Sequence, residues 1–122
     1  MTDPFLALSG LALTWIECLI FLIACAFAAR PDATRDYFVG IRVQATMASD
    51  EAWRAGHRAA LRQAQLACLF LLPPSAMVFA FFGRAPVLVT VIAWGFAATG
   101  LILIVLASAS AARAARAVAA DR

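Results

Sequence analysis

The chain has 122 residues and a formal net charge of +3; 65% of its residues are hydrophobic and only 14% are charged. Soluble domains are about 45–50% apolar and about 25% charged, and a chain of this length has too little interior to bury the excess, so lipid must cover part of its surface. The composition excludes a soluble enzyme, a disordered chain and a small disulfide scaffold, and it predicts one membrane domain, 1–122, without nucleic-acid binding.

Three apolar segments are long enough to cross a membrane. Residues 5–29 carry one charged side chain, Glu17, residues 64–82 contain a proline pair, and residues 86–112 carry no charge. At about 1.5 Å per residue, each segment can span a hydrocarbon core of about 30 Å as a helix. We therefore predict an all-α integral membrane protein with three transmembrane helices.

The arginines predict how these spans are oriented. The loop between the first two spans contains most of them: Arg30, Arg35, Arg42, Arg54, Arg58 and Arg62. The C-terminal tail adds three more, and the opposite side has only Arg84. By the positive-inside rule, the N-terminus should lie outside, and the large loop and the C-terminus should lie in the cytoplasm.

The first apolar segment also resembles a processed signal. Residues 22–25 fit a lipoprotein cleavage pattern, and residues 26–28 fit the A-x-A pattern of a signal peptidase site. A cleaved signal has a basic N-terminal region and a short apolar core, whereas here the first basic residue is Arg30 and Glu17 interrupts the apolar run. We therefore expect this segment to remain as a membrane span.

Residues 30–63 form the polar part of the chain. A serine and two carboxylates at 49–51 predict the start of a helix, because they stabilise its amino end. After that point, arginines recur every four residues: Arg54, Arg58 and Arg62. Trp53 and His57 share a neighbouring face. We expect an amphipathic cytoplasmic helix that leads into the second span, with Trp53 at the level of the lipid headgroups.

This segment also contains a recognisable motif: Gly40, Ile41 and Arg42, then Thr46, then Ser49, Asp50, Glu51, Ala52 and Trp53, then His57, Arg58 and Ala59. The motif resembles the signature of the SdpI family, small bacterial membrane proteins named after an immunity protein against a secreted sporulation-delaying toxin. Asp36 and Val43 depart from the family pattern, which often has Asn and Thr there. The resemblance implies a helical membrane module in a bacterial plasma membrane, with this motif in the cytoplasm.

The motif supplies the first candidate binding site: Asp36, Gly40, Arg42, Trp53, His57 and Arg58. Trp53 and His57 lie on one helix face, and Gly40 allows the preceding loop to fold against it and bring in Arg42. Arg42 and Arg58 would then offer forked donors to a carboxylate or a lipid phosphate, with Asp36 as an internal partner. The alternative is a structural clasp that holds the loop to the helix without a ligand.

Polar groups at mid-depth of the spans form a second candidate site. Glu17 lies about halfway along the first span, and Pro73 and Pro74 free two backbone carbonyls in the second. Ser75 and Thr99 are expected at a similar depth. Such groups can bind a proton, an ion or a small polar group. The alternative, which we favour, is a neutral Glu17 that hydrogen-bonds to a neighbouring helix.

Small residues predict how the third span packs. Gly95 with Thr99, and Ser108 with Ala112, are pairs four residues apart that suit close helix contact, within the bundle or between copies in a homo-oligomer. The three cysteines lie in apolar segments without a CxxC spacing and are expected to act as small hydrophobes. We expect no metal and no cofactor.

No nucleophile–base–acid set, HExxH motif or glycine-rich phosphate loop is recognisable, so we expect no enzyme. The resemblance implies a membrane protein that acts by binding, in immunity against a toxin or antimicrobial peptide or in signal relay. Its partners would be the lipid bilayer and a peptide toxin or another membrane protein. The alternatives are a small accessory subunit of a larger membrane complex, and a minimal oligomeric transporter around Glu17.

Overall fold

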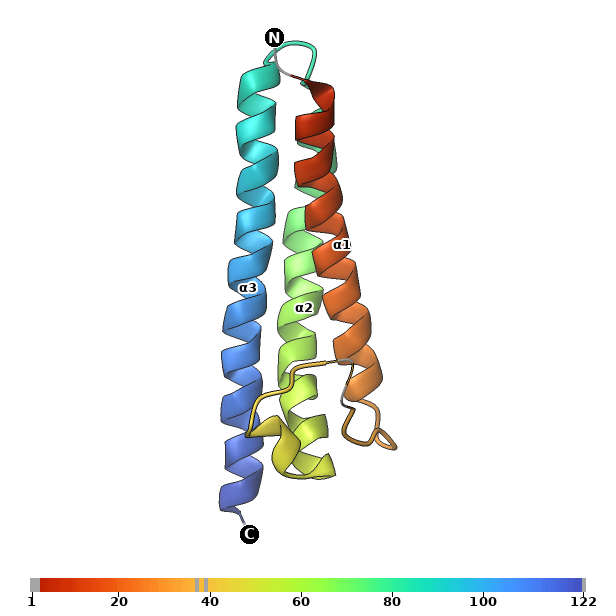
Figure 1. Ribbon diagram of the computed structural model, residues 1–122, viewed down its shortest axis with the longest axis vertical. Coiled ribbons are helices and arrows are strands. Elements are labelled where there is room, and N and C mark those ends of the chain that lie inside the picture. The colour runs from red at the N-terminus through yellow and green to blue at the C-terminus, as the bar shows by residue number, and fades with distance from the viewer. Residues whose placement is uncertain (1–2, 37, 39, 122) are drawn as a thin grey trace.

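The computed structural model describes residues 3–36, 38 and 40–121, and its three long helices lie side by side (Figure 1). The elements, in chain order, are α1 (Pro4–Ala28), the short 3₁₀ helix η1 (Thr46–Ala48), α2 (Asp50–Phe79) and α3 (Pro86–Ala120). Helices α1 and α3 run in one direction and α2 in the other (Figure 1). The described residues contain no strand, so the predicted all-α fold is confirmed.

Helices α1 and α2 begin where the sequence provides capping side chains. The carboxylate of Asp3 accepts a hydrogen bond from the Phe5 amide, 2.9 Å away, at the start of α1. Ser49 accepts one from the Ala52 amide, at 3.0 Å, and so caps α2 as predicted. Each cap satisfies an amide that has no partner within its own helix.

Helix α2 continues directly from the amphipathic segment into the second apolar segment. It contains Pro73 and Pro74 without a break in the assigned helix. A proline cannot donate to the carbonyl four residues before it, so the carbonyls of Leu69 and Phe70 receive no such bond. The amphipathic segment and the second apolar segment are therefore parts of one helix, as expected.

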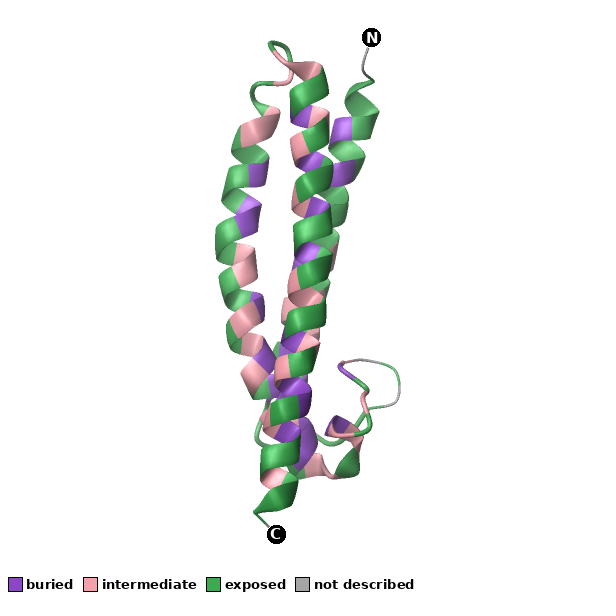
Figure 2. Ribbon diagram, turned by 90° about the vertical axis from the view of Figure 1, so that its left-hand side faces the viewer, coloured by how far each residue is buried: buried purple, intermediate pink, exposed green. Residues whose placement is uncertain are grey.

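Small side chains form the contacts between the helices. Figure 2 shows the buried residues along the inner sides of the bundle. A Cβ at Gly10 of α1 would lie 3.0 Å from the backbone carbon of Ala93, so these two helices touch at their backbones. Of the two small-residue pairs predicted in α3, Gly95 and Thr99 face away from the bundle: Gly95 has no atom within 4 Å of its Cβ position, and Thr99 is exposed. In the second pair, Ser108 is half-buried and Ala112 is buried. The inward face of α3 instead carries a series of alanines and Gly100.

Two of the described helices, α1 and α3, are long and apolar enough to cross a membrane. Within their most apolar stretches, only 33% and 22% of the residues are buried. Large apolar side chains such as Phe5, Ile20 and Val105 are more than half exposed. A water-soluble protein rarely presents apolar surface on this scale, so these helices indicate a membrane protein.

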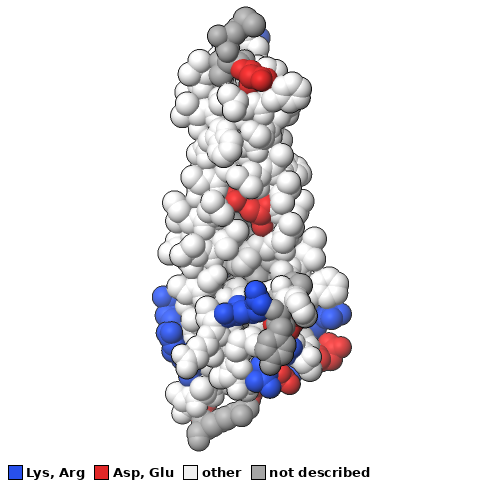
Figure 3. Space-filling view, viewed as in Figure 1, with Lys and Arg blue, Asp and Glu red and all other residues white. Residues whose placement is uncertain are grey.

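The charged residues gather at one end of the bundle. Figure 3 shows basic and acidic side chains around the end that bears the 29–49 segment, while the middle is almost free of charge on this face. At the boundary between the two regions, the Gln63 amide of α2 donates to the Ser110 hydroxyl of α3, at 2.7 Å. The fold therefore has an apolar shaft and one charged end.

Candidate functional site

Two arginines tie the segment after α1 to the first turns of α2. The backbone N–H and the Nε of Arg35 donate to one oxygen of Asp50, at 3.1 and 2.9 Å. Hydrogen bonds from Arg35 also lower the pKa of Asp50. Arg54 donates to the Ala33 carbonyl at 2.9 Å. Arg54 therefore helps to hold this loop and is not simply one member of an exposed charged stripe.

His57 connects the same loop to α2 from inside the fold. Its side chain is fully buried. Its Nε2 accepts from the Ile41 amide at 2.8 Å, and its Nδ1 lies 2.8 Å from the Trp53 carbonyl. An amide can only donate and a carbonyl can only accept, so the ring is neutral and carries its proton on Nδ1. Burial also lowers the pKa of His57, because the charged form loses its hydration.

Gly40 is the point where the loop passes over the two aromatic rings. The rings of Trp53 and His57 are in contact, with centroids 4.1 Å apart. Gly40 has a φ of 105°, and a Cβ there would lie 2.7 Å from His57 Nε2 and 2.9 Å from Trp53 Cη2. Both the backbone conformation and the available space therefore require glycine.

Thr46 holds the next turn of the same loop, which precedes α2, in the space between helices α2 and α3. It is fully buried, and its hydroxyl oxygen lies 2.6 Å from the Ile41 carbonyl and accepts from the Val43 amide at 3.2 Å. Its methyl group fits against Gly56, where a Cβ would lie 2.8 Å from it and 3.0 Å from the Ala111 carbonyl. Gly56 was not among the residues predicted from the sequence; its position inside an amphipathic helix, between Trp53 and His57, is the signal that could have identified it.

The residues at this contact form the His57 cluster: Gly40, Ile41, Thr46, Trp53 and His57. The expectation that Gly40 folds the loop onto the Trp53–His57 face is confirmed. Trp53 is not the exposed membrane anchor that the sequence predicted, because its side chain is 1% exposed and packs against Gly40 and His57.

The charged residues of the predicted site lie outside this cluster. Arg42 and Arg58 are exposed. Asp36 is also exposed, and one of its carboxylate oxygens accepts from the Phe38 amide at 2.7 Å. The motif therefore has two parts, a buried cluster that holds the loop and an exposed set of charged side chains around it.

The mid-depth residues do not form one site. Ser75 is fully buried, accepts from the Trp15 indole at 3.1 Å and donates to the Leu72 carbonyl. Thr99 is exposed and donates to a carbonyl of its own helix. Neither carboxyl oxygen of Glu17 bonds to a described residue, so the expected hydrogen bond to a neighbouring helix is not found there.

Glu17 is accommodated by Gly100 of α3. A Cβ at Gly100 would overlap the carboxyl Oε1. The glycine therefore creates the space in which this carboxyl group packs, and the group also borders a cavity of about 480 Å³ that extends towards Ser108 and Ile41. The sequence indicated the depth of Glu17 but not this contact.

The described residues offer no metal centre, since they contain no group of three or more His, Cys, Asp or Glu side chains that could hold an ion. Cys18, Cys25 and Cys68 are free thiols. Cys68 donates to the Cys18 carbonyl at 3.5 Å, and Cys25 is packed in the core beside Ile41 and Ala107. Their surroundings are those of small apolar side chains.

The SdpI/YfhL protein family matches residues 32–118. This range includes α2, η1, nearly all of α3 and the whole His57 cluster. No similarity to a curated protein or to a solved structure was found.

Proposed function

Because the chain belongs to the SdpI/YfhL family, we propose that it acts by binding, in immunity against a membrane-active peptide toxin or in relaying the presence of that toxin to a partner protein. The main support for this proposal is that the family motif consists of a buried part and an exposed part. The buried His57 cluster holds the loop, and the side chains of Arg42 and Arg58 remain exposed beside it. A surface kept in place by a buried scaffold suits recognition of another molecule.

We propose that all three helices cross a bacterial plasma membrane, with the N-terminus outside and the His57 cluster in the cytoplasm. Helix α2 lies beside α1 and α3 and ends at the same end of the bundle as their starts (Figure 1). Its second half exposes Leu69, Phe70 and Met77, each more than 60% exposed. Lipid contact accounts for these side chains, and the arginine distribution supports the orientation.

The experiment compares variants in bacterial cells that lack the gene and are challenged with membrane-active peptides. Wild-type protein should restore growth, and Arg58→Ala should reduce that protection while the protein remains as abundant and as stable as wild type. Arg116→Ala is the matched control, because it removes an exposed arginine near the C-terminus. Full protection by the Arg58→Ala, Arg42→Ala double variant would contradict the proposed surface.

In the same assay, His57→Gln distinguishes a structural role of His57 from direct contact between His57 and a bound partner. Glutamine can accept from the Ile41 amide but keeps less of the ring packing, so protection should fall only as far as protein stability falls. A His57→Gln protein as stable as wild type but inactive would instead assign the imidazole a direct role in binding.

An accessory subunit of a larger membrane complex is the second candidate function. Gly95 and Thr99 form a small-residue face on α3 that points away from the bundle. Such faces allow another helix to approach closely in a membrane. Purification of a tagged copy in mild detergent tests this candidate: a stoichiometric second protein, lost with Gly95→Leu, would support it over toxin immunity.

A further inference from the structure

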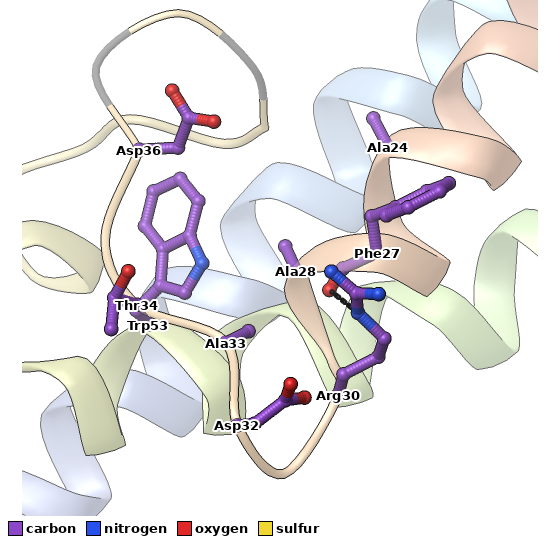
Figure 4. A pocket seen from close by; sticks show the side chains of 9 residues that line it. All are labelled: Ala24, Phe27, Ala28, Arg30, Asp32, Ala33, Thr34, Asp36 and Trp53. Atoms are coloured by element: carbon purple, nitrogen blue, oxygen red, sulfur yellow. Dashed lines mark hydrogen bonds between the residues drawn. The ribbon is translucent and has the colours of Figure 1, made fainter.

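A cavity of about 250 Å³ lies between the end of α1, the segment 30–36 and Trp53 (Figure 4). The side chain of Trp53 is 1% exposed, and its Nε1 has no hydrogen-bond partner among the described residues. Figure 4 shows this nitrogen turned towards Ala28 and Arg30. A buried donor without a partner is costly, so the cavity favours a ligand that brings a hydrogen-bond acceptor.

Arg30 adds a positive charge to the same cavity. Its Nε donates to the Phe27 carbonyl at 3.2 Å, and its guanidinium lies over the Phe27 ring, 4.7 Å from the centroid. These two contacts orient the guanidinium and leave its terminal nitrogens as further donors. A fixed guanidinium beside an indole N–H suits a phosphate group, which accepts several hydrogen bonds.

Two carboxylates line the cavity as well, Asp32 and Asp36. One Asp36 oxygen accepts from the Phe38 amide. A simple anion would be repelled by these carboxylates. Figure 4 shows the two carboxylates at opposite ends of the cavity, with Trp53 between them. A headgroup that carries both a phosphate and an ammonium matches the donors of Trp53 and Arg30 with its phosphate and the carboxylate of Asp32 with its ammonium.

An apolar groove continues from this cavity along the outer face of α1. The groove has a volume of about 350 Å³ and shares Ala24, Phe27 and Asp36 with the cavity. Its other walls are Ile20 and Ile23, which are 63% and 54% exposed. Helix α1 is one of the two helices apolar enough to cross a membrane, so an acyl chain of the bilayer can reach this groove directly.

We propose that this site binds a phospholipid with an ethanolamine headgroup. The phosphate accepts from Trp53 Nε1 and from Arg30, and the ammonium donates to Asp32. One acyl chain lies along Ile20 and Ile23. This inference goes beyond the proposed function, since it concerns a lipid held beside the His57 cluster and does not depend on any toxin or protein partner.

The test uses the full chain in detergent micelles, with Trp15→Phe and Trp94→Phe so that Trp53 gives the only indole N–H signal in an NMR spectrum. Short-chain phosphatidylethanolamine should shift this signal in a saturable way. Short-chain phosphatidylglycerol lacks the ammonium, and phosphatidylcholine has a quaternary ammonium that cannot donate, so both should bind at least about fivefold more weakly. Inorganic phosphate and free phosphoethanolamine, which lack acyl chains, should not saturate the signal at the same concentrations.

Variants identify the contacts. Arg30→Gln should weaken binding of the ethanolamine lipid at least about fivefold, and Asp32→Asn should reduce its advantage over phosphatidylglycerol. Arg84→Gln, at the opposite end of the bundle, is the control and should change neither. An indole signal that responds to no lipid, or equally to all three lipids, would overturn the proposal. A response to inorganic phosphate equal to that of the lipid would also overturn it, because the site would then be a simple anion site.

Discussion

His57 accepts a hydrogen bond at Nε2 from the Ile41 amide, so the only imidazole of the chain is directly bonded to the loop that precedes α2. A protonated imidazole has a hydrogen on both nitrogens. Protonation would therefore place two donors against each other at this contact and leave a charge buried beside Trp53. The attachment of the loop to α2 thus requires a neutral His57.

Acidification should weaken this end of the fold. Burial lowers the pKa of His57 in the folded protein, whereas in the unfolded chain this histidine titrates at about 6.5. The unfolded state therefore binds more protons as the pH falls through this value, and the free energy of unfolding decreases towards lower pH. Chemical unfolding in detergent, together with hydrogen exchange of the Ile41 amide, measures the effect between about pH 7.5 and about pH 5.

The control for this pH dependence is His57→Gln, which cannot titrate and should give a flatter profile over the same range. Asp50 does not interfere, because its hydrogen bonds with Arg35 lower its pKa and move its titration to more acidic conditions. Stability that remained constant or increased on acidification would contradict the prediction.

Gly40→Ala should destabilise the protein by about 2–4 kcal/mol. Alanine is strained at a φ of 105°, and its Cβ would lie 2.7 Å from His57 Nε2. Gly83→Ala is the matched control, because no atom lies within 4 Å of that Cβ position. Thermal unfolding of the three proteins in the same detergent tests this; equal losses in both variants would show that the contact at Gly40 is unimportant.

Gly100→Ala should destabilise the bundle by about 1–3 kcal/mol, because the new methyl group would overlap the carboxyl group of Glu17. Gly95→Ala, on the open side of the same helix, should have little effect. Adding Glu17→Ala to Gly100→Ala should restore much of the loss, since it removes the overlapping group. A double variant no more stable than Gly100→Ala would contradict this prediction, because the loss of stability would then not come from overlap with Glu17.

Single cysteines test the proposed orientation in intact cells. In a protein without its native cysteines, a cysteine at Ala85 should react with a membrane-impermeant thiol reagent, whereas cysteines at Ala33 and Ala119 should be protected until the cells are opened. The prediction follows from the arginines, which lie mainly on the side of Ala33 and Ala119. Reaction of a cysteine at position 33 in intact cells would contradict the proposed orientation. It would favour the alternative that the first apolar segment is a cleaved signal.

The helices could be predicted from local sequence, because apolar runs, the capping serine at Ser49 and proline at Pro86 act within a few residues. The His57 cluster was predictable in part. Helical spacing placed Trp53 beside His57, and the family motif directed attention to Gly40. These features are local or nearly so, and they required no knowledge of how the three helices pack.

Burial of Trp53 could not be predicted in the same way. It depends on the loop lying across the indole, and that position depends on Thr46 fitting between Gly56 and Ala111. Ala111 lies far along the chain, on α3, and nothing in the local pattern specifies that contact. The same reasoning applies to Glu17, whose depth follows from its place in the helix but whose neighbour, Gly100, follows only from helix packing.

The proline pair in α2 has a mechanical consequence. Leu69 and Phe70 lack the backbone bonds that would resist bending at this point, whereas the helix before them is held by Gln63 and by the contacts around His57. Pro73 and Pro74 thus act as a hinge. The part of α2 beyond the prolines contacts α1 through Ser75 and Trp15. It can tilt while the part before the prolines stays fixed, so a deformation at the far end of α2 is absorbed by the hinge before it reaches the loop that precedes α2.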